Sequence, residues 1–204
     1  NSFITNNLKN GKLVINLEMY FNDNLEIDNF IAKGKIKELD GILNNNISIK
    51  NTSFNFFGDS SDILIKNVKS ETDGLFIKNG NLQIKKDDDI SIKFDFTTEI
   101  KINKENISNY LSILKNTKFI NQEFNLDGKF DNFLNITFDK TFKVVDYDYT
   151  NKGKINNSLL IFEEPIKSSF LENNIKNLYF KDTNLNLRFA SDQKNYIYSS
   201  GTSS

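Results

Sequence analysis

The sequence predicts an all-β protein, a long curved antiparallel β-sheet meander that forms an open groove, with one or two short amphipathic helices. Three observations indicate the all-β meander, although they do not by themselves distinguish an open groove from a closed sheet. Large apolar residues recur at every second position in many segments, turn-forming residues separate those segments, and helical periodicity is confined to short stretches. Roughly ten or more strands at short spacing, without alternating helices, favour antiparallel pairing of neighbours.

The clearest strand runs from Ile90 to Ile102. Every even position except Thr98 is large and apolar, and the odd positions between them are polar. Alternate side chains of a pleated strand point to opposite faces, whereas a helix would distribute these residues around its circumference. The segment therefore predicts one long strand, or two strands joined at a bend near Thr98. The same alternation predicts strands over Leu13–Phe21, Phe124–Phe130 and Leu134–Phe138.

Shorter apolar runs predict the remaining strands. They lie at Phe30–Lys37, Ile47–Phe57 with a break near Asn51, Ile63–Val68, Leu75–Ile84, Val144–Tyr149, Leu159–Phe162, Ile175–Phe180 and Leu185–Phe189. Pairs of Asn or Asp with Gly tolerate positive φ and are typical of tight turns. We therefore expect turns at Asn10-Gly11, Asp40-Gly41, Asp73-Gly74, Asn79-Gly80 and Asp127-Gly128.

One segment has helical periodicity. From Asn103 to Leu114, apolar residues are spaced at i, i+3, i+4 and i+7, and Asn103 is a suitable N-cap with Glu105 in the first turn. We expect a short amphipathic helix there, with Ile107, Tyr110, Leu111 and Leu114 on its apolar side. The segment Ser168–Asn174 is a second, weaker helical candidate.

The chain shows no shift in composition that would mark a domain boundary. We expect a single β-groove domain over residues 1–198, followed by a polar tail or truncation point at 199–204. The sequence opens at Asn1 without Met and shows no signal-peptide pattern, so we expect a piece of a larger protein. Its longest apolar run, Leu159–Phe162, is far shorter than the roughly 20 residues that span a bilayer.

Composition excludes several function classes. The 204 residues include 26 basic and 27 acidic side chains, so no excess of positive charge is present to bind nucleic acid. The chain has no His and no Cys, which excludes disulfides, thiolate nucleophiles, zinc sites and imidazole-dependent triads. Any catalysis would depend on carboxylates, Lys, Tyr or Ser, and the sequence predicts no cofactor.

Two acidic groups are the candidates for chemistry. Asp87-Asp88-Asp89 could supply oxygen ligands to Ca²⁺, but it lacks the spaced calcium-loop pattern and falls where a hairpin turn is expected. Glu163 and Glu164 are adjacent, and neighbouring strand residues point to opposite faces, so the pair cannot flank one bond. The sequence therefore predicts no catalytic residue and no metal site.

The apolar stripe along the strands has two interpretations. The stripe could be the core of a closed sandwich or barrel. Alternatively, it could line an open trough for lipid acyl chains, because periodicity alone does not reveal whether a second layer covers it. In the second case the lipid-binding residues are Leu13, Ile15, Leu17, Ile90, Ile92, Phe94, Phe96, Ile100, Ile102, Phe124, Leu126, Ile136 and Phe138.

Successive segments of the chain resemble AsmA-like proteins of Gram-negative envelopes. The resemblance is carried by Phe30–Ile36, Asn46–Phe56 and Gly74–Ile84, in which G-x-I strands, I-x-x-x-x-F strands and hydrophobic-x-x-G-x-L hairpins follow one another. The segment Ile107–Leu114 and the returning strand Phe124–Phe130 also resemble that family. The likeness is a pattern of residue classes spread over most of the chain, without a catalytic motif.

The resemblance implies a function and a location. It implies a non-enzymatic segment of an envelope protein whose apolar β-groove shields phospholipid acyl chains, and which contributes to phospholipid transport between the inner and outer membranes or to outer-membrane integrity. The expected location is the periplasm, attached to the inner membrane through a segment not present in this chain. Two alternatives are a closed β-sandwich or β-solenoid that serves as a structural or adhesive surface module, and a carboxylate-dependent hydrolase.

Overall fold

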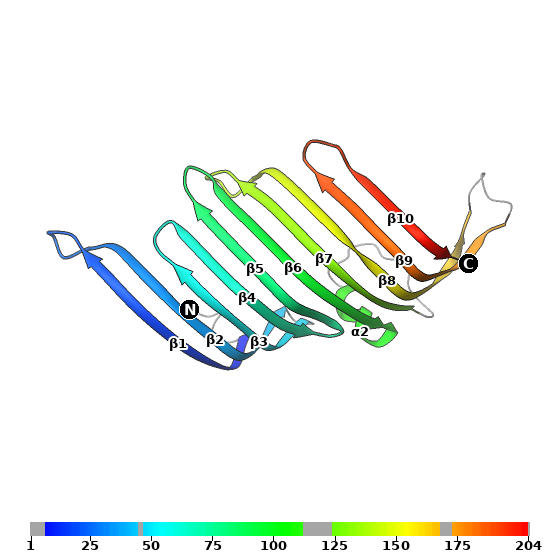
Figure 1. Ribbon diagram of the computed structural model, residues 1–204, viewed down its shortest axis with the longest axis horizontal. Helices are drawn as coiled ribbons and strands as arrows, with labels where there is room; N and C mark the ends of the chain where they lie inside the picture. The colour runs from blue at the N-terminus through cyan, green and yellow to red at the C-terminus, as the bar shows by residue number, and fades with distance from the viewer. Residues whose placement is uncertain (1–6, 45–46, 112–123, 168–172, 204) are drawn as a thin grey trace.

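The computed structural model describes residues 7–44, 47–111, 124–167 and 173–203. Ten strands form one antiparallel sheet in which each strand pairs with its neighbours in the sequence. The strands lie side by side in chain order, with β1 and β10 at opposite ends of the molecule (Figure 1). The sheet does not close on itself, which confirms the predicted open meander.

The strands are longer than most of the segments that predict them. Their bounds are β1 Leu8–Phe21, β2 Ile27–Asn44, β3 Ile47–Gly58, β4 Asp62–Thr72, β5 Leu75–Lys86, β6 Ile90–Asn103, β7 Phe124–Phe138, β8 Val144–Ile166, β9 Ile175–Ala190 and β10 Tyr196–Ser203, with helix α2 at Lys104–Leu111 between β6 and β7.

Strand β6 is continuous through Thr98, because its register with β7 runs without a shift from Ile90 opposite Phe138 to Asn103 opposite Asn125. Of the two predicted alternatives, one long strand is therefore the correct one. Four other predicted strands merge into two. Val144–Tyr149 and Leu159–Phe162 belong to β8, and Ile175–Phe180 and Leu185–Phe189 belong to β9.

β-Bulges explain why those strands are split in the sequence pattern. In β9, Lys181 and Asn184 pair with Thr202 and Ser200 of β10, so β9 contains one residue more than its partner there, and Asp182 within that stretch has φ 50°. An extra residue reverses the parity of the alternation, so apolar side chains stay on one face while the period-two pattern is interrupted. Positive φ angles mark bulges of the same kind at Glu38 in β2, Asn51 in β3 and Asn67 in β4.

The turn prediction is wrong for most of the Gly-containing pairs. Of the five, only Asp73-Gly74 lies in a turn, with φ 33° and 90° between β4 and β5. The other glycines lie inside strands, where their missing side chain leaves room for neighbours. A Cβ on Gly80 would overlap the Phe96 ring, and one on Gly128 would lie 2.7 Å from Phe130. These glycines serve close packing within the sheet.

Side-chain carboxylates and amides hold the hairpin loops. Asp59 Oδ1 accepts hydrogen bonds from the N–H groups of Ser61 at 2.8 Å and Asp62 at 2.7 Å. Asp139 accepts from the Thr141 N–H at 2.8 Å in the same way, and Asn22 Oδ1 accepts from two loop N–H groups. These side chains mimic backbone turns. The loops therefore close without Gly.

Helix α2 begins at a reciprocal cap. Asn103 Oδ1 accepts hydrogen bonds from the N–H groups of Glu105 and Asn106, and Asn106 Oδ1 accepts from the Asn103 N–H at 2.7 Å. This arrangement satisfies helix N–H groups that lack intrahelical partners. It confirms Asn103 as the N-cap. Leu114 and residues 168–172 lie outside the described part of the chain, and the described residues 173–174 are not helical.

Residues 199–203, which the sequence predicts to be a polar tail or truncation point, are the last five residues of β10. Ser199 pairs with Leu185, and Ser203 pairs with Phe180. The ladder uses backbone groups, so an edge strand forms even where its side chains are Ser and Thr.

We expect Gly153→Ala to destabilise the sheet. A Cβ at Gly153 would overlap the Lys129 carbonyl oxygen and lie 2.8 Å from Phe130 Cα, which is fixed backbone. Overpacking of this kind costs about 1–3 kcal/mol, measurable as a lower urea midpoint. Gly58→Ala is the matched control, because its Cβ would make an ordinary 3.4 Å contact with the Asp62 carbonyl. Equal effects of the two substitutions would contradict the packing role of Gly153.

We expect stability to fall in acid and to stay level near neutrality. The Asp62 N–H holds the pKa of Asp59 below its ordinary value, and the Thr141 hydroxyl does so for Asp139. A carboxyl whose pKa is lowered by folding stabilises the native state above its unfolded pKa, about 3.9, and loses that contribution as pH falls further. With no His in the chain, no side chain of ordinary pKa titrates between about pH 5 and 8.

Urea unfolding at a series of pH values tests this expectation. The free energy of unfolding should be constant from about pH 5 to 8 and should decline below about pH 4. The variant D59N/D139N should decline less, because Asn can accept the same loop hydrogen bonds, as Asn22 does in its own hairpin. A transition between pH 5 and 8 would be inconsistent with this account.

Candidate functional site: an open apolar face

Strand register places the predicted lipid-binding residues on one face of the sheet, which we call the apolar face. All thirteen lie there: Leu13, Ile15, Leu17, Ile90, Ile92, Phe94, Phe96, Ile100, Ile102, Phe124, Leu126, Ile136 and Phe138. One row of directly opposed residues crosses nine strands, and opposed residues have their side chains on the same face of the sheet. From β1 to β9 it runs Ile15, Gly34, Phe56, Ile65, Leu82, Phe94, Leu134, Tyr149 and Phe189.

The apolar face is largely uncovered. Each strand packs against its neighbours in the sheet, and α2 packs against β6 and β7. In the described part of the chain, no second layer of strands lies on either face. Leu13 and Leu17 are 59% and 50% exposed, and among the residues that the structure describes none of the large side chains reaches full burial. The closed sandwich or barrel is therefore wrong for this chain.

The total surface area supports the same conclusion. The chain exposes 13947 Å², whereas a compact globular protein of its mass, 23.6 kDa, exposes about 9,800 Å². The excess of about 4,000 Å² is the consequence of a single-layered sheet, whose two faces both meet solvent. On the apolar face this exposed area includes Ile, Leu and Phe side chains at regular spacing.

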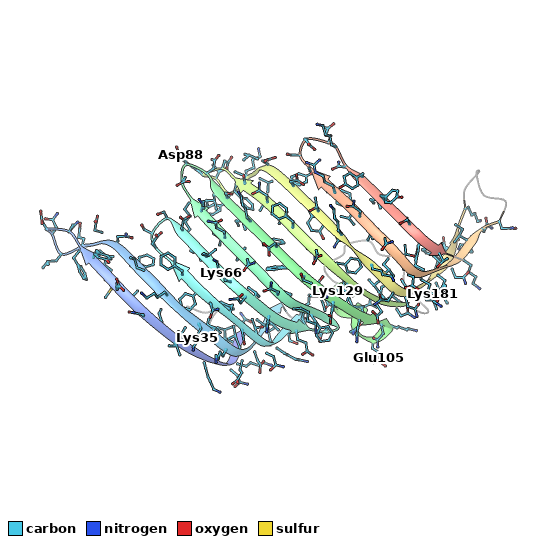
Figure 2. The ribbon with its side chains drawn as sticks, viewed as in Figure 1. Lys35, Lys66, Asp88, Glu105, Lys129 and Lys181 are labelled. Carbon is cyan, nitrogen blue, oxygen red and sulfur yellow. The ribbon has the colours of Figure 1, made fainter. Side chains whose placement is uncertain are left out.

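The opposite face, the polar face, carries the charges. Lys35, Lys66, Lys129 and Lys181 lie on it by register and are spread across the sheet, as Figure 2 shows. Its ion pairs are exposed, as in Lys154–Asp182 at 2.7 Å between β8 and β9. Exposed pairs contribute little individually. The polar face therefore resembles an ordinary solvated surface.

The only Arg of the chain also lies on the polar face. Arg188 Nη2 donates to Asp148 Oδ2 at 2.7 Å, and Nη1 donates to Asp192 Oδ1 at 3.1 Å. These bonds raise the pKa of Arg188 and lower that of Asp192. The guanidinium ties β8 to the β9–β10 hairpin, so its role in the structure is to join strands.

A polar cluster interrupts the apolar face near its centre. Asn132 donates to Thr98 Oγ1 at 3.0 Å, and its Oδ1 accepts from the Tyr149 hydroxyl at 3.1 Å and from Asn151 Nδ2 at 2.7 Å. Thr98 and Asn151 are each 8% exposed. Burial raises the pKa of Tyr149, which keeps the phenol a neutral donor near neutral pH. The sequence analysis missed this cluster, although Asn132 occupies an apolar position in the alternation of β7.

Helix α2 covers one end of the apolar face. Ile107 is buried, and the Tyr110 hydroxyl donates to the Thr72 carbonyl at 2.8 Å. Ile102, at this end of β6, is 8% exposed, unlike the half-buried Ile90, Ile92 and Phe94 along the same strand. The helix therefore protects one end of the face and leaves the remainder accessible.

Two shallow hollows lie on the uncovered part. One, of about 490 Å³, is lined by both apolar and polar residues of β1 and β2, including Leu8, Leu13, Ile36 and Leu39. Another, of about 280 Å³, is lined mainly by Phe30, Phe56, Phe57 and Ile63. The first hollow is also lined by Lys9 and Lys12, and the second by Asp59 and Lys86.

The acidic run considered for calcium binding is not part of the lining of either hollow. Asp87, Asp88 and Asp89 form the loop between β5 and β6, as expected for a hairpin turn, and Asp88 pairs with Lys140 at 3.0 Å. Glu163 and Glu164 are successive residues of β8. No group of three acidic residues among the described residues is arranged to hold a metal ion.

Comparison of this chain with protein-family models, with curated proteins and with solved structures finds no match. The described part of the chain contains no helix that is both long and apolar enough to cross a membrane. The fold and the site therefore define the protein by class, as a single-layered antiparallel sheet with one open apolar face.

We expect Asn132→Ala to destabilise the protein through loss of the polar cluster. The substitution would remove partners from Thr98 and Asn151, which are both buried. Leaving buried polar groups unpaired costs about 1–3 kcal/mol, measurable by urea unfolding. The exposed Asn177→Ala is the control. An Asn132 variant as stable as this control would mean that the cluster contributes nothing to the sheet.

Proposed function

We propose that this chain is a non-enzymatic segment of a lipid conduit, in which the apolar face shields the acyl chains of phospholipids from water. The observation that carries the proposal is the open face itself, which crosses β1 to β9 and has no second layer of strands over it in the described part of the chain. Exposed apolar patches of soluble monomers are rarely larger than a few hundred Å², and larger ones mark surfaces that bind a partner or a lipid.

The energetics favour an extended apolar ligand. Exposing a lipid chain to water costs about 0.8 kcal/mol per CH₂, so a diacyl lipid with about thirty methylenes faces a barrier on the order of 20 kcal/mol to crossing water. Contact with Ile, Leu and Phe side chains removes part of this cost. The affinity need not exceed that of a bilayer, so lipid can enter and leave without catalysis.

The dimensions are also suitable. Strands lie about 4.8 Å apart, so a ten-stranded sheet extends roughly 45 Å across its strands. That distance exceeds the roughly 30 Å of a bilayer hydrocarbon core. A lipid chain could therefore lie along the face, and one such sheet would form a section of a longer path.

The resemblance to AsmA-like proteins supports a place for this path in a Gram-negative envelope. On that basis we propose a periplasmic location, attachment to the inner membrane through a segment not present in this chain, and a role in phospholipid transport or outer-membrane integrity. Phospholipid is then the partner, and the proposal requires no nucleic acid, metal or cofactor.

The test substitutes one Phe on each face. Phe94 lies on the apolar face of β6, stacked on Phe96 with ring centroids 5.0 Å apart, whereas Phe133 lies on the polar face of β7 and is 43% exposed. In Phe94→Asp the carboxylate would adjoin the acyl chain without a partner, so lipid occupancy should fall at least ~10-fold. Phe133→Asp should leave occupancy unchanged.

Occupancy is measured by mass spectrometry of phospholipid that co-purifies with the gently extracted protein, with thermal melting recorded for each variant. Both variants should remain folded. Absence of phospholipid from the unsubstituted chain would refute the proposal. So would a Phe94→Asp variant that unfolds while the Phe133 control does not, because that result would mean that Phe94 serves packing within the sheet and not contact with lipid.

A further inference from the structure

The polar cluster on the apolar face contains an acceptor without a partner. Asn151 is 8% exposed, and its Oδ1 is buried without a hydrogen-bond partner among the described residues. An unpaired buried acceptor is costly, and native structures contain few of them. A donor from outside the chain would therefore stabilise the protein at this atom.

Backbone carbonyl groups fix the orientation of the cluster. Asn132 Nδ2 donates to the Phe96 carbonyl at 3.2 Å and to the Phe130 carbonyl at 3.4 Å, and a carbonyl oxygen only accepts. The Asn132 Oδ1 must then face β8, where it accepts from the Tyr149 hydroxyl and from Asn151 Nδ2. Because Asn151 presents its NH₂ group to Asn132, its own Oδ1 is turned away from that residue.

The other groups of the cluster have partners. Asn132 Oδ1 already accepts two hydrogen bonds. Thr98 Oγ1 accepts from Asn132 at 3.0 Å and donates to the Phe130 carbonyl at 3.4 Å. The open position at Asn151 Oδ1 is complementary to the O–H of a hydroxyl group. It does not suit an ester carbonyl or a phosphate oxygen, which only accept.

The surroundings of Asn151 are uncharged. The three rows of opposed residues that contain Leu134, Asn132 and Phe130 cross β5 to β9 at this level, and none of their members is charged. A phosphate head group would lose its hydration there without a compensating cation. A hydroxyl group within a hydrocarbon chain would meet one acceptor, and the rest of the chain would meet apolar side chains.

We propose that the apolar face selects phospholipids whose acyl chain carries a hydroxyl group partway along its length, and that Asn151 Oδ1 accepts the hydrogen bond of that hydroxyl. This inference rests on the proposed function, because it names the class of lipid that the face holds. The position within the chain follows from the flanks of the cluster. Along β6, Ile92 and Phe94 lie on one side of Thr98, and Ile100 and Ile102 lie on the other.

A ligand hydroxyl reaches the buried Oδ1 after a neighbouring side chain moves. Tyr149 is suited to this movement, because it is half-buried and its hydroxyl interacts with the Asn151 side chain. Rotation of the Tyr149 ring would break its hydrogen bond to Asn132 Oδ1, which would keep the one from Asn151. The movement therefore leaves Asn132 Oδ1 paired.

Competition between matched lipids tests the selection. Vesicles with equal amounts of dioleoyl, diricinoleoyl and O-methyl-diricinoleoyl phosphatidylcholine are incubated with the purified full chain, and the lipid recovered with the protein is measured by mass spectrometry. Ricinoleoyl and oleoyl chains differ only by one mid-chain hydroxyl group. We expect about tenfold more diricinoleoyl than dioleoyl lipid on the protein. The methyl ether accepts but does not donate, so it should bind no better than the dioleoyl lipid.

Two variants of β8 assign the selection to one side chain. Asn151→Leu has a similar shape but no acceptor, so it should bind dioleoyl and diricinoleoyl lipid equally. The control, Tyr149→Phe, keeps Asn151 Oδ1 and should retain the preference. Thermal melting shows whether each variant is folded. The methyl ether comparison needs no substitution, so it tests the proposal even where Asn151→Leu does not fold.

The outcomes separate this inference from the lipid conduit. Equal binding of the three lipids would leave the conduit in place and overturn the selection, as a water molecule bonded to Asn151 Oδ1 would produce. A methyl ether bound as well as the hydroxylated lipid would also overturn it, and so would a preference that persists in folded Asn151→Leu. Failure of all three lipids to bind would refute the conduit, and this inference with it.

Discussion

The structure depends on hydrogen-bonded register between strands that are neighbours in the sequence. Each strand alternates apolar and polar side chains, and pairing in register brings the apolar ones to the same side of the sheet. Because no second layer forms in the described part of the chain, this register is the principal tertiary constraint. A shift of one residue in any strand would move its apolar side chains to the polar face.

Bulges reconcile this register with strands that are long and curved. Where an extra residue such as Glu38, Asn51 or Asp182 lies in a strand, the side chains that follow it change face. The apolar and polar residues of the sequence exchange positions at the same point. The two reversals cancel, so the apolar face continues across the bulge. Bulges also increase local twist and bend the strand. The positive φ angles at Asn51 and Asn67 fall on a residue type that tolerates them.

A single layer leaves its apolar side chains without a core, and this determines what the molecule can do. The half-buried Ile and Phe side chains of β6 gain part of their burial from neighbours in the sheet, and the remaining area is available to another apolar molecule. The polar cluster around Asn132 shows that the face also holds hydrogen-bonded polar groups, although Asn151 Oδ1 is buried there without a hydrogen-bond partner. Its side-chain hydrogen bonds join β6, β7 and β8 across the open face.

The sequence by itself determined the all-β class, the antiparallel meander, the helix cap at Asn103 and the assignment of Leu13, Phe94 and Ile136 to one face. Local alternation and capping chemistry contain this information, because both depend on residues near each other in the chain. The tertiary structure decided that the face stays open, that Asn132 and Asn151 meet, and that Gly80 and Gly128 serve packing instead of turns. These features depend on which strands become neighbours and on whether anything lies above them. An alternating strand has the same pattern of residues in an open sheet as in a closed sandwich.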